Sequence, residues 1–154
     1  MKLFKLVLLM SLIAGPAFAT PADREDDLGV GAMAGTVTGV TATKWMDTHR
    51  AFDIAYGANP DAESQVHADH LWTFEAGLPW RIMPYGGVGL GAGFNRELDN
   101  QERDIDAFAR VPVGLSWYAD RVPVGVFAEI APSFIVTPVA TGYMDANLGA
   151  RYHF

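Results

Sequence analysis

Apolar and polar side chains alternate strictly along the last eleven residues of the chain, 144–154. The even-numbered positions from Met144 to Phe154 are all apolar, and the odd-numbered positions between them are polar residues or glycine. Successive side chains of a β-strand point to opposite faces of the sheet. The alternation therefore predicts a strand that lies between an apolar and a polar environment.

The same patterning recurs through most of the chain and predicts eight strands. In the segment 105–118 the odd-numbered positions from Ile105 to Trp117 are apolar. In the segment 80–94, Val88 and Leu90 alternate with glycines, which we expect to face the interior of a narrow barrel. The predicted strands cover residues 28–35, 39–46, 50–57, 64–74, 80–94, 105–118, 122–136 and 142–154.

The first 19 residues have the organisation of a secretory signal peptide. Lys2 and Lys5 give a positive start, an apolar run follows, and Ala17 and Ala19 form a small-x-small cleavage site. The apolar run is much shorter than the roughly 20 residues that a membrane-spanning helix needs. We therefore predict a cleaved signal peptide at 1–19, an acidic N-terminal arm at 20–27 and a β-barrel over 28–154.

Composition narrows the class of protein. There is no cysteine, which excludes disulfides and zinc–thiolate sites. Without residues 1–19, nine Lys and Arg remain against 18 Asp and Glu, a net charge of −9, so we expect no nucleic-acid binding. No window of 18 residues after the signal is continuously apolar, so a membrane protein of this kind must cross as strands. The predicted fold is all-β: an eight-stranded antiparallel up-and-down transmembrane β-barrel preceded by a cleaved signal peptide.

Two further patterns fit an outer-membrane protein. Asn147, Gly149, Tyr152 and Phe154 resemble the C-terminal signal that the barrel assembly machinery of Gram-negative bacteria reads. With the N-terminus in the periplasm, short turns fall on that side, and the longer connections 58–63 and 95–104 lie outside. Four tryptophans fall near the periplasmic rim, where we expect them to form an interfacial aromatic girdle: Trp45, Trp72, Trp80 and Trp117.

The inward faces of the predicted strands carry charges of both signs. Such charges should pair, because an isolated charge in a dry interior costs several kcal/mol. Glu129 and Arg151 lie on neighbouring strands and would face each other if the last turn centred near Val139 and Ala140. We expect the whole set to form a packed polar plug. The alternative is an ion or proton path, since ionisable residues inside a membrane are often functional. The set is Lys44, Arg81, Arg110 and Arg151 with Asp53, Asp69, Asp106, Glu129 and Asp145.

Several segments resemble a widespread family of small eight-stranded outer-membrane β-barrel proteins, with spirochaetal and other Gram-negative members. The resemblance is carried by Pro84–Gly91, Arg110–Tyr118, Val126–Pro132 and the C-terminal signal. Gly39–Trp45 and Asp69–Phe74 resemble the N-terminal half of the family less closely. The resemblance implies the eight-stranded barrel, and it implies no reaction and no known ligand.

No catalytic, cofactor-binding or metal site is expected. His67 and Asp69 share one face of a strand, but two ligands do not make a metal site and a third is not evident in the sequence. Ser64 lies three residues from His67, which places the two side chains on opposite faces and argues against a hydrolytic pair.

The sequence therefore favours a non-enzymatic, monomeric outer-membrane barrel with a structural or surface-interaction role. Its expected partners are outer-membrane lipids, lipopolysaccharide, the barrel assembly machinery, and an extracellular ligand at loops 58–63 and 95–104. Two alternatives stay open: a lipid-modifying outer-membrane barrel enzyme, and a periplasmic lipocalin-like binding barrel. The lipocalin-like alternative requires the apolar faces of the strands to point inward.

Overall fold

The computed structural model describes residues 27–59, 63–78, 82–94, 105–119, 121–137 and 140–154. Within these ranges the chain forms nine strands and every pairing between them is antiparallel. The predicted signal peptide and all of the acidic arm except Asp27 lie outside the described residues. The strands are β1 (Leu28–Gly35), β2 (Thr38–Trp45), β3 (Arg50–Ala58), β4 (Ser64–Thr73), β5 (Ile82–Phe94), β6 (Ile105–Arg110), β7 (Val113–Tyr118), β8 (Val124–Thr137) and β9 (Thr141–His153).

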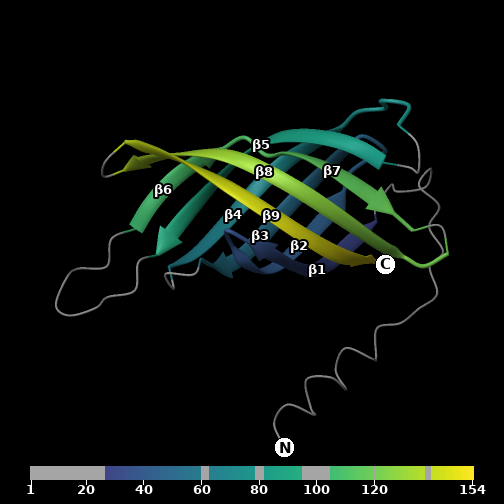
Figure 1. The fold of residues 1–154 in the computed structure, drawn as a ribbon, viewed down its shortest axis with the longest axis horizontal. Coiled ribbons are helices and arrows are strands. Elements are labelled where there is room, and N and C mark those ends of the chain that lie inside the picture. The colour runs from purple at the N-terminus through teal and green to yellow at the C-terminus, as the bar shows by residue number, and fades with distance from the viewer. Residues whose placement is uncertain (1–26, 60–62, 79–81, 95–104, 120, 138–139) are drawn as a thin grey trace, which may run out of the picture.

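The sheet closes on itself as a barrel (Figure 1). From β1 to β5 each strand pairs with the next, β8 pairs with β9, and β9 returns to pair with β1. β6 and β7 share a single position in the ring, because both pair with β5 on one side and with β8 on the other. The ring therefore has eight strand positions, which confirms the predicted antiparallel, up-and-down, all-β architecture.

The predicted strand 105–118 is interrupted, which corrects the expectation of one continuous strand. The break falls at Val111 and Pro112, where proline has no N–H to give to the strand ladder. Backbone hydrogen bonds to the neighbouring strands continue at the break. The Val111 N–H donates to Pro132 O at 3.0 Å, and the Gly87 N–H donates to Pro112 O at 2.8 Å. The alternation continues across it, with Val111 exposed and Pro112 buried.

The two faces of the barrel differ in chemistry as the alternation predicts. Large apolar side chains cover the outer face, among them Leu90 with 70% and Leu148 with 66% of its surface exposed. The interior combines a few apolar residues, such as Met33 and Phe127, with many buried polar and charged ones. Across the described ranges there is no helix with the length and apolar character needed for a membrane span.

The seam between β1 and β9 is held together by contacts between residues at the start of β1 and residues at the end of β9. Nδ1 of His153 lies 2.9 Å from Oδ2 of Asp27, and the Phe154 N–H donates to Leu28 O at 2.9 Å. Both side chains of the Asp27–His153 pair are buried. A Cβ at Gly29 would lie 2.8 Å from the His153 ring, so glycine is what allows this close approach. The inward face of β9 thus closes the ring at one rim.

The connection between β2 and β3, at the same rim as the end of β9, is organised by Asp47. Its Oδ1 accepts hydrogen bonds from the backbone N–H groups of His49 and Arg50, both at 2.8 Å. Its Oδ2 accepts from Nε of Arg50 at 2.6 Å. The His49 amide and the Arg50 guanidinium together hold the pKa of the Asp47 carboxyl below its usual value, because they stabilise the charged form.

Candidate functional site: the charged interior

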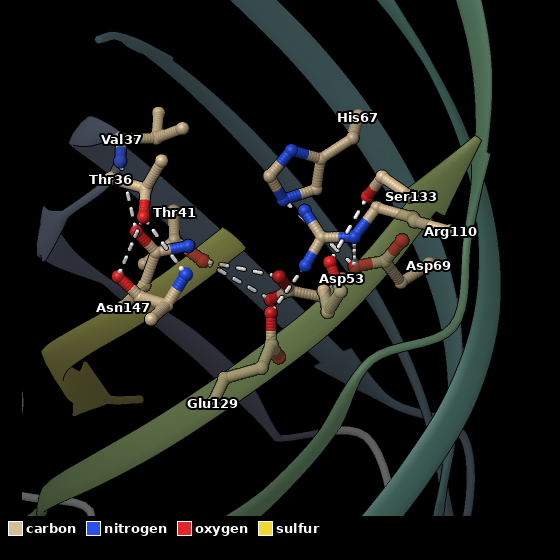
Figure 2. Close-up of polar contacts among 12 residues, drawn as sticks. Thr36, Val37, Thr41, Asp53, His67, Asp69, Arg110, Glu129, Ser133 and Asn147 are labelled. Carbon is tan, nitrogen blue, oxygen red and sulfur yellow. Dashed lines mark hydrogen bonds and ion pairs between the residues drawn. The ribbon is translucent and has the colours of Figure 1, made fainter. Parts of the chain in front are cut away.

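A network of charged side chains centred on Arg110 crosses the barrel interior (Figure 2). Arg110, on β6, donates from Nη2 to Glu129 on β8. Its Nε lies 3.5 Å from Oδ2 of Asp69 on β4. The Tyr85 hydroxyl, on β5, donates to the other Glu129 oxygen at 2.9 Å. One guanidinium therefore connects carboxylates from two strands, β4 and β8, that do not pair with each other, which is how a buried charge is kept paired.

A second ion pair is built around Arg151 on β9. Its Nη2 lies 2.9 Å from Oδ1 of Asp53 on β3, and the same nitrogen donates to the Thr41 hydroxyl at 2.9 Å. The hydroxyls of Thr41 and Thr43, on β2, both donate to the Asp53 carboxylate. The Arg151 guanidinium also lies 4.0 Å above the centre of the Phe127 ring, a cation–π arrangement. Asp53 is thus satisfied by three side chains from two strands.

Asp53, His67 and Asp69 form a compact cluster between the two arginines. Asp53 lies directly opposite Asp69 in the β3–β4 register, and His67 is two residues along the same face of β4. One ligand atom from each of the three lies within 4.8 Å of the others. The three residues are almost completely buried, with 4%, 4% and 1% of their surfaces exposed.

A cavity of about 350 Å³ lies next to this network, at the end of the barrel that carries the predicted outer loops. Three carboxylates line it, those of Glu63, Asp106 and Asp145. Gln65 and Phe108 also line it, and Gln65 is two residues before His67 on the same face of β4. The cavity therefore adjoins the layer of the interior that holds the His67 side chain.

Comparison with known proteins identifies this architecture. The sequence matches no protein-family model and no curated protein. The structure is similar to the N-terminal β-barrel domain of Pseudomonas aeruginosa OprF, with a TM-score of 0.70 and 19% identity over 84% of this chain and 98% of that domain. It is also similar to Neisserial surface protein A, with a TM-score of 0.58 and 15% identity over 83% and 94% of the two chains. The fold is that of the small outer-membrane β-barrels. A de novo designed transmembrane β-barrel is similar as well, with a TM-score of 0.55, 16% identity, and coverage of 84% and 96%.

Within this outer-membrane barrel fold, most of the charges assigned to the interior do point inward. The exception is Lys44, which is exposed on the outer face, so its assignment to the interior was wrong. It pairs in register with Leu28 and Phe52, two exposed apolar residues. Arg81 lies outside the described residues. The assigned charges that are buried or half-buried inside are Asp53, Asp69, Asp106, Arg110, Glu129, Asp145 and Arg151.

Because Lys44 faces outward, the side chain of its neighbour Trp45 faces inward, which is opposite to the prediction. Trp45 was expected in the outer girdle, but it is 3% exposed and packs in the interior core. The phase of β2 is set by the hydroxyls of Thr41 and Thr43, which must face inward to reach Asp53. Trp72 and Trp117 are exposed on the outer face, where a girdle residue has to be. Trp80 lies outside the described residues.

The four residues of the C-terminal signal divide between the two faces. Tyr152 and Phe154 are partly exposed on the outer face and their rings meet edge to face, with centroids 4.9 Å apart. Asn147 points inward and its Oδ1 accepts the Val37 N–H at 3.0 Å. Gly149 also faces inward, since a Cβ there would collide with the Phe127 ring. These contacts give the inward pair a packing role in the barrel, and recognition by an assembly machinery stays a prediction.

The expected pairing of Glu129 with Arg151 was wrong in register. Glu129 lies opposite Asn147, and Arg151 lies opposite Gly125. Glu129 pairs instead with Arg110 on the neighbouring strand β6, and Arg151 pairs across the interior with Asp53 on β3. Sequence reasoning also missed the partners that are not charged, such as Thr41 and Tyr85. An inward-facing hydroxyl opposite a carboxylate is the signal that would have found Thr41.

Proposed function

We propose that this chain is an integral outer-membrane β-barrel protein with a structural or surface-interaction role and a closed interior. The observation that carries the proposal is the inversion of polarity: large apolar side chains cover the outside and paired charges fill the inside. A soluble protein rarely leaves a large contiguous apolar surface in water, whereas lipid requires one.

The same observation argues against the periplasmic lipocalin-like alternative. A soluble barrel that binds an apolar ligand needs its apolar faces inside and its polar faces in water. Here Arg110 and Asp69 are 1% exposed, while Ile54, Val113 and Phe134 are about half exposed on the outer face. Ion pairs of this kind would leave little apolar lining for such a ligand.

Export to the outer membrane is supported by two sequence features, the signal-like segment 1–19 and the C-terminal pattern that ends at Phe154. We infer an N-terminus in the periplasm, because the longest connection between strands, 95–104, then lies on the cell surface, on the same side as 58–63. The partners that follow are outer-membrane lipids, lipopolysaccharide and the barrel assembly machinery. An extracellular ligand would meet the longer connections.

We also infer that the barrel is not an enzyme. Catalysis by a serine requires a hydroxyl next to a base and within reach of substrate. Ser116 donates its hydroxyl to Met83 O and Ser133 donates to Ala131 O, both at 3.2 Å and both buried. His67 is buried on the inward face, whereas Ser64 pairs in register with the outward-facing Phe94. These placements favour packing roles for the serines and for His67.

Fractionation and conductance test the proposal together. The protein should be recovered with outer membranes, and its folded form should migrate differently from its boiled form in SDS gels. Purified protein in planar bilayers should give no stable large channel, because Tyr85, Phe108, Arg110 and Phe127 fill the interior. Recovery as a soluble periplasmic protein would overturn the membrane assignment. Long-lived, water-filled conductance would overturn the closed interior.

A further inference from the structure

The cluster of Asp53, His67 and Asp69 combines ligand types that suit a metal ion. Imidazole nitrogen with carboxylate oxygens is a donor set that Zn²⁺ and other first-row divalent ions accept. The residues come from two neighbouring strands of a rigid wall, and one potential ligand atom from each lies within 4.8 Å of the others. His67 Nε2 lies 3.9 Å from Asp69 Oδ2, a separation that an ion between the two could bridge with small side-chain adjustments.

The charge balance of this layer favours an additional cation. Among the described residues the two ion-pair networks contain three carboxylates, those of Asp53, Asp69 and Glu129, and two guanidiniums, those of Arg110 and Arg151. Arg151 forms an ion pair with Asp53, and the closest ion-pair contact of Arg110 is to Glu129. Asp69 is left with the longer 3.5 Å contact to Arg110. A buried negative charge without full compensation is expensive, and a bound cation removes the cost.

Two polar atoms of the cluster are also buried without a hydrogen-bond partner among the described residues. They are Nδ1 of His67 and Oδ1 of Asp69, on side chains that are 3% and 1% exposed. Buried polar atoms are normally satisfied, so the unsatisfied ones show that hydrogen bonding in this layer is incomplete. Nε and Nη1 of the neighbouring Arg110 also lack a hydrogen-bond partner in the part of the chain that the structure describes, and the atoms of His67 and Asp69 that face each other are Nε2 and Oδ2. In Figure 2 the His67 ring is directed toward the Arg110 guanidinium and the carboxylates around it.

We propose that Asp53, His67 and Asp69 bind a first-row divalent transition-metal cation such as Zn²⁺ inside the barrel. Asp53 and Asp69 supply oxygen and His67 supplies nitrogen. Mg²⁺ and Ca²⁺ prefer all-oxygen ligand sets and should bind this site poorly. Arg110 stays bound to Glu129 and acts as a neighbouring positive charge, which limits the affinity of the site. The inference goes beyond the proposed structural role, because it gives the interior a ligand.

The neighbouring cavity offers a way in. It is lined by the carboxylates of Glu63, Asp106 and Asp145, and it reaches Gln65, two residues from His67 on the same inward face. A concave region lined by one sign of charge raises the local concentration of the opposite ion. Cations on the side of the predicted outer loops would therefore be drawn toward the cluster.

The test uses the whole barrel, purified and folded in detergent, stripped with chelator and then dialysed against Zn²⁺. We expect close to one Zn²⁺ per barrel by elemental analysis, and competition by Co²⁺ but not by Mg²⁺ or Ca²⁺. His67→Gln should weaken Zn²⁺ binding at least tenfold. The matched control is His49→Gln, because His49 is exposed in the β2–β3 connection and lies outside the cluster. Both variants must show the heat-dependent gel shift of a folded barrel.

A second measurement does not depend on the folding of His67→Gln. Cu²⁺ added at one equivalent to the unmodified barrel and to His49→Gln should give an electron spin echo signal modulated by an imidazole nitrogen. Three results would overturn the proposal: no binding above the level of an unrelated barrel, equal Zn²⁺ binding by His67→Gln, or loss of the bound ion in His49→Gln. Competition by Ca²⁺ as strong as by Co²⁺ would also overturn it, since it would exclude the histidine.

Discussion

Val113→Arg tests the outer face of the barrel at the depth where lipid is least tolerant of charge. Val113 is the first residue of β7 and is 50% exposed on the outer face. In register it lies between Gly86 of β5 and Ile130 of β8. An arginine here would project from the middle of the apolar surface, where it has no carboxylate neighbour in either register pair. The substitution therefore measures whether this surface is in contact with hydrocarbon.

The expected cost follows from the position of Val113 along the wall. Ile130, its partner, is the seventh of the 14 residues of β8. Trp117 is four residues from Val113 along β7, which at about 3.3 Å per residue and a tilt of roughly 40° is about 10 Å in depth. The apolar band of such barrels is about 25 Å tall, so Val113 lies near its centre. Arginine at this depth should cost about 2–4 kcal/mol.

The matched control is Val122→Arg, in the connection between β7 and β8. Val122 is 52% exposed, so the two sites start from the same residue and nearly the same exposure. At the rim the cost should fall to about 0–1 kcal/mol. Urea titration of both variants in vesicles of short-chain and long-chain lipid measures the difference, and the Val113→Arg penalty should grow with bilayer thickness. Equal costs at the two sites would refute the assignment of this face to lipid.

Three further predictions concern the C-terminal residue Phe154, the interior and the β2–β3 turn. Deleting Phe154 should reduce outer-membrane yield in cells far more than refolding in detergent; an unchanged yield in cells would contradict its role in assembly. Gly114→Ala should destabilise the barrel by about 1–3 kcal/mol whatever the bilayer thickness, because the new Cβ would lie 2.6 Å from the Tyr85 ring. The folded-state pKa of Asp47 is lowered, so its stabilising contribution is complete above the pKa of the unfolded carboxyl and is lost as pH falls through the folded one. Asp47→Asn should therefore be less stable than the unmodified barrel at neutral pH and equally stable in strong acid, which denaturant titration at several pH values can measure.

The fold could be predicted because one pattern, the alternation of apolar and polar residues, determines which face of each strand meets the barrel interior. Where alternation is strong, as in β9, the predicted faces are confirmed from Met144 to Phe154. The signal fails where neighbouring positions have similar polarity. In β2, Thr41, Thr43 and Lys44 are all polar, so the sequence does not fix which of them point inward. In the structure the two threonines point inward, because their hydroxyls donate hydrogen bonds to the Asp53 carboxylate. If Lys44 pointed inward instead, the side chain of Trp45, which is buried in the interior, would lie on the outer face.

The candidate site could be predicted in part, for a related reason. Alternation assigns a residue to a face, but it carries no information on how far one strand slides along the next. Glu129 and Arg151 are both inward, as predicted, yet the register places them opposite Asn147 and Gly125. Contacts between strands that do not pair are harder still to predict, since Arg110 of β6 reaches Asp69 of β4.

Asp53, the third ligand of the proposed metal site, could not be identified from the sequence because the strand register was not known. From the sequence, His67 and Asp69 are two ligands on one face, and Asp53 is another inward carboxylate on the preceding strand. The β3–β4 register sets Asp53 directly opposite Asp69, a pairing of like charges that destabilises a sheet unless something compensates it. Two arginines and two threonines provide part of that compensation, yet Asp69 keeps one oxygen without a partner. A barrel that needed only a packed plug could have placed a neutral residue opposite Asp53. The second carboxylate, placed next to a histidine, is therefore the feature from which we infer a cation that binds all three residues.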